Sequence, residues 1–194
     1  MQGNQRPLPR RKSIRLKDYD YSQPGYYFIT GCVLGRQCLF GSVVGDAVEL
    51  NAVGEIVSKE WHDLPRRFPS VGLDAFVVMP NHVHGIIILR GREAESTPTT
   101  RKRPLTLGQV TRAFKSLSAV HVNALLGRHG PLWQRLFHDH ITRDDWDLNR
   151  IREYIQNNPA SWALDLENPD CKEPSDIEKW IRGLRREPPD EPRR

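Results

Sequence analysis

Two apolar segments on either side of a short turn constrain the fold of this chain more than any other feature. Leu73 to Met79 and Val83 to Leu89 are rich in aliphatic and β-branched residues, which favour strands, and Pro80-Asn81 between them is a turn signal. Two strands that are joined so closely pair antiparallel. We therefore expect an antiparallel sheet that contains this pair.

Amphipathic helices alternate with the other predicted strands. Apolar side chains recur at intervals of three and four after Asn51, and again after the capping box that Thr106 forms with Gln109. The predicted order is strand, strand, helix, paired strands, helix, strand and helix, over Tyr26 to Val33, Cys38 to Leu50, Asn51 to Pro65, Leu73 to Leu89, Thr106 to Gly127, Leu132 to Thr142 and Asp144 to Asn158. This order predicts an α+β fold of the ferredoxin-like type, in which helices cover a small antiparallel sheet.

With 194 residues, the chain is long enough for one domain with an extension at each end. We expect a basic N-terminal arm over residues 1–20, because this segment is poor in apolar side chains. The domain is expected over residues 21–164, with a flexible loop at 91–104. Residues 165–194 are expected to form a polar, Pro-rich C-terminal tail, in which a short helix near Ile177 to Leu184 can dock.

Several classes of protein are excluded by what the sequence lacks. No apolar run approaches the ~20 residues of a membrane span, and the basic N-terminus has no apolar signal segment, so we expect no membrane partner and a cytoplasmic location. The three cysteines are an odd number without a C-x-x-C spacing, which argues against a disulfide framework or a cysteine zinc site. No glycine motif for a nucleotide is present, so we expect no ATP or dinucleotide.

Two pairs of histidines are the clearest local sign of chemistry. Side chains alternate between the faces of a strand, so His82 and His84 point to the same side. Two neutral imidazoles can hold a divalent ion in this way, although they can equally be ordinary polar residues of a half-exposed strand. His138 and His140 form a second such pair. We favour the first pair because Gly85 follows it, and a glycine lets a ligand approach the backbone.

The last predicted helix carries a tyrosine at the edge of its apolar stripe. Leu148, Ile151 and Ile155 form this stripe, and Tyr154 and Asn158 lie on one flank, one turn apart. The Tyr154 hydroxyl can therefore reach a cleft, or it can be the polar tip of a core aromatic residue.

The sequence motifs, taken together, resemble those of the IS200-like tyrosine transposases, and more narrowly the REP-associated branch. The resemblance covers roughly residues 10 to 162. It rests on His82-Val83-His84-Gly85 within a strand, Tyr154-Ile155 followed by Asn158-Pro159, the leading segments Arg15 to Tyr21 and Gly25 to Thr30, Met79-Pro80-Asn81-His82, Leu132-Trp133-Gln134 and Asp139-His140-Ile141.

This resemblance implies an HUH endonuclease fold and a single-strand DNA transposase. His82 and His84 would bind a divalent metal ion, most simply Mg²⁺ or Mn²⁺, with Asn158 as a third polar ligand. Tyr154 would be the nucleophile that forms a 5′-phosphotyrosyl intermediate. The implied substrate is single-stranded or hairpin-forming REP-type DNA, the implied location is the nucleoid, and both a monomer and a homodimer remain open.

Basic and aromatic side chains offer further contacts to DNA. The formal net charge is +5, and two basic clusters account for much of the positive field. We expect these side chains to bind DNA phosphates: Arg10, Arg11, Lys12, Arg15, Arg101, Lys102 and Arg103. Ordinary solvated surface is the competing interpretation. Four aromatic residues can stack on bases or belong to the core: Tyr19, Tyr21, Tyr26 and Trp133.

Two other functions fit the same residues. One is a non-catalytic module that binds single-stranded nucleic acid, such as a domesticated transposase. The other is a metal hydrolase that uses His82, His84, His138 and His140, for which Tyr154 would be irrelevant.

Overall fold

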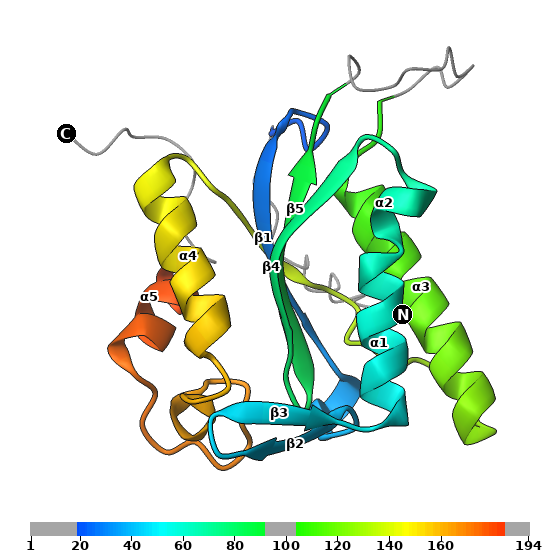
Figure 1. Ribbon diagram of the computed structural model, residues 1–194, viewed down its shortest axis with the longest axis vertical. Helices are drawn as coiled ribbons and strands as arrows, with labels where there is room; N and C mark the ends of the chain where they lie inside the picture. The colour runs from blue at the N-terminus through cyan, green and yellow to red at the C-terminus, as the bar shows by residue number, and fades with distance from the viewer. Residues whose placement is uncertain (1–18, 92–103, 185–194) are drawn as a thin grey trace, which may run out of the picture.

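The computed structural model describes residues 19–91 and 104–184, and a four-stranded sheet lies at its centre (Figure 1). The strand order is β4-β5-β1-β6, and all neighbouring strands are antiparallel. These strands are β1 (Gly25–Cys32), β4 (Val71–Val78), β5 (His82–Leu89) and β6 (His138–Ile141). A separate two-stranded ribbon consists of β2 (Gly41–Val44) and β3 (Ala47–Leu50).

Helices cover both faces of the sheet (Figure 1). One face carries α1 (Ala52–His62), α2 (Leu64–Arg67) and α3 (Leu107–Leu126), and the other carries α4 (Asp145–Asn157) and α5 (Asp176–Leu184). Two short 3-10 segments, η1 (Leu34–Arg36) and η3 (Trp162–Leu164), lie in the connections. The predicted α+β fold, with helices over an antiparallel sheet, is confirmed.

The turn at Pro80-Asn81 joins the predicted strand pair. β4 and β5 pair from Val78 opposite Val83, with an irregularity of register further along the pair. The strand that we predicted from Leu132 is shorter, because β6 begins only at His138. Trp133 instead turns into the core, where its indole N–H donates to the Ser118 hydroxyl at 2.9 Å. Tertiary packing therefore decides the state of this segment.

The sheet separates two apolar clusters, and β5 contributes to both. Val83 and Ile87 belong to the larger cluster, which includes residues of α1 and α3, whereas Ile86 belongs to the cluster with α4 and α5. Because side chains alternate along a strand, His82 and His84 share the face of Ile86. Both histidines therefore lie under α4 and α5.

Gly85 serves packing on the face opposite the histidines. A Cβ atom at this position would lie 2.4 Å from Cζ2 of Trp61 and 2.9 Å from Cδ2 of Phe76, and these two rings stack at 4.5 Å between centroids. Our interpretation that Gly85 leaves room for a ligand was wrong, because the indole of Trp61 fills the space. The glycine is needed because an aromatic ring lies directly on the strand.

Part of the segment that we expected to form a polar tail packs against the sheet. Ile181 and Leu184 of α5 are buried in the cluster with α4, and Ile177 packs against it. These three side chains recur at intervals of four and three, which places them on one face of the helix. The predicted N-terminal arm and the predicted loop at 91–104 lie almost entirely outside the described residues.

Within residues 19–91 and 104–184, no helix combines the length and the apolar character that crossing a bilayer requires.

We expect Gly85→Ala to lower the free energy of unfolding by about 1–3 kcal/mol, because the added methyl group overpacks Trp61 and Phe76. Urea denaturation followed by circular dichroism measures this loss. Gly183→Ala is the matched control, since nothing lies within 4 Å of a Cβ there and alanine favours a helix. An unchanged unfolding midpoint for Gly85→Ala would contradict the packing argument.

Candidate functional site

Four segments bring polar side chains together in the interior. β5 supplies His82 and His84, and β1 supplies Thr30, which lies directly opposite His84 in the strand register. α4 supplies Tyr154, and the loop after η3 supplies Asp165. All five residues are at most 4% exposed, so they form a buried polar group in an otherwise apolar layer.

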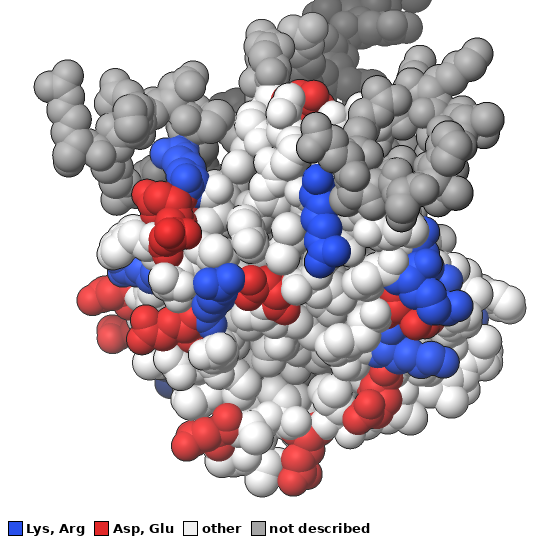
Figure 2. Space-filling view, turned by 45° about the horizontal axis from the view of Figure 1, so that its top comes forward, with Lys and Arg blue, Asp and Glu red and all other residues white. Residues whose placement is uncertain are grey.

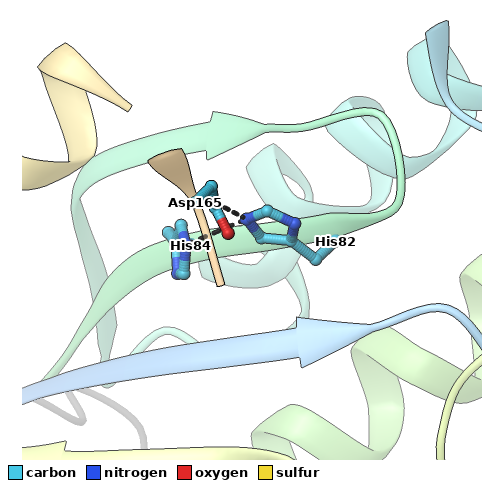
Figure 3. Close-up of side chains that lie close together, drawn as sticks. All are labelled: His82, His84 and Asp165. Atoms are coloured by element: carbon cyan, nitrogen blue, oxygen red, sulfur yellow. Dashed lines mark hydrogen bonds and ion pairs between the residues drawn. The ribbon is translucent and has the colours of Figure 1, made fainter. Parts of the chain in front are cut away.

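Three of these side chains converge closely enough to hold one metal ion (Figure 3). His82 Nε2 lies 2.9 Å from His84 Nε2 and 3.5 Å from Asp165 Oδ2. Each side chain offers one ligand atom, and these atoms all lie within 4.8 Å of one another. Two imidazoles and a carboxylate are a common donor set for divalent ions.

Asn81 determines which nitrogen of His82 carries a proton. The Asn81 amide nitrogen donates to the backbone carbonyls of Arg36 at 3.1 Å and Glu167 at 2.7 Å, so the orientation of this amide is settled. Its oxygen must then accept a hydrogen bond from His82 Nδ1, at 2.8 Å. In neutral His82 the lone pair therefore lies on Nε2, which faces His84 and Asp165.

A cation would stabilise the contact between Asp165 and His82. The Oδ2 atom of Asp165 is buried and has no hydrogen-bond partner among the described residues. A buried carboxylate oxygen that faces an imidazole lone pair is unfavourable unless a proton or a metal ion lies between the two. The donor set and its orientation therefore fit a divalent metal ion.

His84 connects this group to the tyrosine. Its Nε2 atom lies 3.0 Å from the Tyr154 hydroxyl, and its Nδ1 atom lies 3.0 Å from the Thr30 hydroxyl. A hydroxyl group can donate or accept, so Thr30 supports either tautomer of His84. When the lone pair is on Nε2, it can accept the Tyr154 proton or bind a metal ion, but it cannot do both.

The loop that carries Asp165 is held against the end of the sheet. Arg36 forms an ion pair with Glu167 at 3.1 Å, and Asn81 binds the Glu167 carbonyl. Asp165 Oδ1 accepts the backbone N–H of Glu167 at 2.6 Å, which leaves Oδ2 facing the histidines. Asp165 was not among the predicted site residues, because it lies in the expected tail and at no fixed spacing from the histidines.

Helix α4 positions Tyr154 and is itself anchored to β4. Asp144 caps the helix by accepting the Asp147 N–H at 2.7 Å. Arg152 binds both carboxylate oxygens of Asp74, at 2.9 and 2.6 Å, and these hydrogen bonds hold the pKa of Asp74 below its usual value. A bidentate ion pair of this kind restricts the movement of the helix, and of Tyr154 on it, relative to the sheet.

Asn158 lies one turn after Tyr154, and both line a pocket of about 660 Å³. Asn158 is buried, and neither atom of its amide has a hydrogen-bond partner among the described residues. A buried amide without a partner is costly, which is consistent with a ligand at this point. Its predicted role as the third metal ligand stays a prediction, and Asp165 is the side chain found beside the histidines.

Comparison with known proteins places the chain among relatives. No family model matches it. A Haemophilus influenzae protein, described as uncharacterized, is 39% identical over 170 residues, which cover 81% of this chain and 93% of that protein. The chain belongs to one family with this Haemophilus protein.

The fold is shared with a solved DNA-processing protein. A REP-associated tyrosine transposase, solved bound to a REP hairpin, matches with a TM-score of 0.53 and 20% identity, over 87% of this chain and 86% of that chain. The resemblance to the tyrosine transposases is thereby confirmed at the level of the fold.

The second pair of histidines lies outside the group around His82. His140 Nε2 binds Asp147 Oδ2 at 2.7 Å, and so links β6 to the first turn of α4. Burial favours a higher pKa for Asp147, but the hydrogen bond from His140 and the charges nearby outweigh it, so this pKa lies below its usual value. Among the described residues, the ligand atoms that lie close enough together to share a metal ion belong to His82, His84 and Asp165. His138 and His140 are not part of this group.

Most of the residues that we predicted to contact DNA are not among the described residues. All seven basic residues of the two clusters fall outside the described residues: Arg10, Arg11, Lys12, Arg15, Arg101, Lys102 and Arg103. On the face that Figure 2 displays, basic side chains are interspersed with acidic ones. Trp133 and Tyr21 are buried in the core, whereas Tyr26 is 36% exposed.

We expect Asp165→Asn and His82→Ala each to weaken Mn²⁺ binding at least about tenfold, because each removes a ligand atom from the group. Isothermal titration calorimetry measures the affinity. Asp170→Asn, an exposed acidic residue of the same loop, is the matched control. If Asp165→Asn binds Mn²⁺ as the wild type does while Asn158→Ala does not, then Asn158 is the third ligand.

Proposed function

We propose that this protein is a metal-dependent tyrosine transposase that nicks and rejoins single-stranded DNA. The observation that carries the proposal is the 3.0 Å contact between the Tyr154 hydroxyl and His84, next to a second histidine and a buried carboxylate. Single-stranded or hairpin-forming DNA is the proposed substrate, supported by the fold shared with a transposase whose structure contains a REP hairpin. Such an enzyme would act at the nucleoid.

His82, His84 and Asp165 would hold the divalent ion, Mg²⁺ or Mn²⁺, with the orphaned Asn158 amide as a further ligand. When bound, this ion would offset the negative charge of a phosphodiester and favour the ionised phenol, whose pKa in water is ~10. Asn81 and Thr30 would orient the two imidazoles through their outer nitrogens.

Tyr154 would act as the nucleophile. Its phenolic oxygen attacks phosphorus, which forms a P–O bond to Tyr154 and breaks the bond between phosphorus and the 3′ oxygen of the preceding nucleotide. The phenol loses its proton, and the departing 3′ oxygen gains one. The number of phosphodiester bonds is conserved in the 5′-phosphotyrosyl product, so a second 3′-OH can displace Tyr154 and rejoin DNA without ATP.

We propose that the strand reaches Tyr154 through the pocket beside it. Tyr154 is 4% exposed, yet it lines this pocket together with Asn158, whereas His82, His84 and Asp165 are not among the lining residues. A single strand can place one phosphate there, whereas the stacked bases of a duplex would hinder such an approach. We propose that the basic arm and the basic residues at 101–103 bind the neighbouring phosphates.

We expect Tyr154→Phe to abolish both strand cleavage and the covalent protein–DNA band, because the nucleophilic oxygen is lost. DNA affinity is expected to stay within about twofold of the wild type, since no charge changes. A labelled pool of single strands of randomised sequence, incubated with Mn²⁺ and run on a denaturing gel, measures the band. Tyr26→Phe is the control, and chelation of Mn²⁺ is expected to remove the band reversibly.

Three outcomes would reject this assignment. Cleavage that survives in Tyr154→Phe but not in His82→Ala indicates a histidine-based metal hydrolase. Binding by the wild type without any cleavage indicates a non-catalytic module. A covalent band that is unaffected by chelation contradicts the metal site.

Replacing Arg10, Arg11 and Lys12 together by alanine is expected to flatten the salt dependence of single-strand binding. Each lost phosphate contact makes the negative slope of log affinity against log salt shallower by about 0.7, so the loss of all three makes it shallower by about 2. Fluorescence anisotropy at several salt concentrations measures the slope. Alanine at the exposed Arg66 and Arg112, on the side of α2 and α3, is the control; an equal change there would show that the arm has no special role.

A further inference from the structure

Helix α4 carries four distinctive side chains at a constant spacing of four residues. Trp146, Arg150, Tyr154 and Asn158 follow one another in this way, so they lie in one row along the helix and its C-terminal end. The row begins with an indole that is 56% exposed and ends with a buried amide. The tyrosine therefore lies in line with an exposed aromatic ring two turns away.

One pocket connects the members of this row. All four line the same 660 Å³ pocket, together with Asn149 and Asn157. This volume exceeds what a single nucleobase needs and falls in the ordinary range for ligand sites. A molecule in this pocket can contact Tyr154 and Trp146 at once.

The side chains that line the pocket carry no net charge, so they do not by themselves attract a phosphate; a phosphate at Tyr154 would depend on the ion that His82, His84 and Asp165 would hold. Arg150 is the basic residue among the lining side chains, and Glu153 is the acidic one, so their charges offset each other. The Arg150 guanidinium also lies over two indole rings, 5.1 Å from the centre of Trp146 and 4.3 Å from that of Trp180. Its planar face is therefore occupied by cation–π contacts.

The remaining groups fit an unstacked base. An exposed indole stacks on the flat face of any nucleobase, and the Asn157 amide can donate to and accept from a base edge. The Asn149 amide nitrogen can donate to a base edge, while its oxygen accepts from Arg152 at 3.0 Å. Recognition by stacking tolerates every base, while the amides can add a preference.

We propose that this pocket, the Trp146 pocket, binds one base of the DNA strand next to the phosphate that Tyr154 attacks. The proposal rests on the proposed function and extends it by naming the group that positions the strand. Trp146 is a positioning residue in this assignment, because it touches the DNA but not the reacting atoms. Seating a flanking base would hold the phosphate at the tyrosine.

A structural clasp is the competing explanation for the same contacts. Trp146 meets Trp180 of α5 edge-on at 6.2 Å between ring centroids, and Arg150 lies against both. If these contacts serve only to hold α5 on α4, the loss of Trp146 will lower thermal stability and will weaken all ligands alike.

The test compares DNA with and without bases in the Tyr154→Phe chain, which cannot cleave. The probes are a fluorescein-labelled dT 12-mer and an abasic 12-mer with the same phosphates, and the added variants are Trp146→Ala, Trp146→Phe and the control Leu125→Ala, an exposed residue of α3. We expect Trp146→Ala to weaken binding of the dT 12-mer by about 5- to 150-fold and to leave binding of the abasic strand within about twofold. Trp146→Phe is expected to restore most of the affinity for the dT 12-mer. The melting temperature of the Trp146→Ala variant is expected to equal that of the parent Tyr154→Phe chain.

Two results would overturn the assignment of the Trp146 pocket. One is dT binding that is unaffected by Trp146→Ala, and the other is an equal loss on both probes together with a lower melting temperature, which is the signature of the clasp.

The position of the bound base is tested in the chain that retains Tyr154. With the randomised pool, Trp146→Ala is expected to raise the DNA concentration needed for half-maximal covalent product by about 5- to 150-fold, as it weakens binding of the dT 12-mer. An unchanged half-maximal concentration overturns the placement next to Tyr154. A wild type that forms no covalent product overturns the proposed function, and with it this placement, whereas the comparison of dT and abasic strands still decides whether Trp146 binds a base.

Discussion

A buried carboxylate and a buried imidazole lone pair face each other across 3.5 Å, and the site depends on what balances them. The lone pair of His82 points inward because the Asn81 amide oxygen accepts a hydrogen bond from Nδ1–H on the other side of the ring. The oxygen, and not the nitrogen, of Asn81 faces His82 because the amide nitrogen donates to two backbone carbonyls. A chain of ordinary hydrogen bonds, which begins in the backbone, thus turns a ring nitrogen lone pair and a carboxylate oxygen toward the same point, an arrangement that suits a divalent ion.

Helix α4 connects the group around His82 with the pocket that lines one side of the helix. It carries Tyr154 near the buried end of a row and Trp146 at the exposed end, so the proposed nucleophile and the proposed base platform share one helix. The ion pair between Arg152 and Asp74 joins the helix to β4, and the bond between His140 and Asp147 joins it to β6. With both edge strands of the sheet attached to it, α4 is well suited to hold a reacting oxygen in place.

One face of β5 packs in the larger core, and the opposite face carries the two histidines of the candidate site. Val83 and Ile87 secure the larger core, and Gly85 admits the indole of Trp61 to the same side. On the opposite side, His82 and His84 are surrounded by the smaller cluster of α4 and α5. Apolar surroundings strengthen electrostatic interactions inside the group, because water cannot screen them there. The polar site thus lies on the face of the sheet that carries α4 and α5, where the loop of Asp165 also reaches the histidines.

Local patterns in the chain were sufficient for the pairing of β4 with β5, for the helices and for the shared side of His82 and His84, because alternation and helical period act over a few residues. They did not predict where β6 begins, which depends on the packing of Trp133 in the core. The helical pattern singled out Tyr154, the resemblance to transposases gave it a role as nucleophile, and the fold places its hydroxyl 3.0 Å from His84. No pattern revealed Asp165, which reaches the histidines through a loop held by Arg36 and Asn81, nor the reason for Gly85, which depends on a ring from α1. Contacts between segments distant in sequence carry no periodic signal, so only the tertiary structure could decide which carboxylate faces the imidazoles.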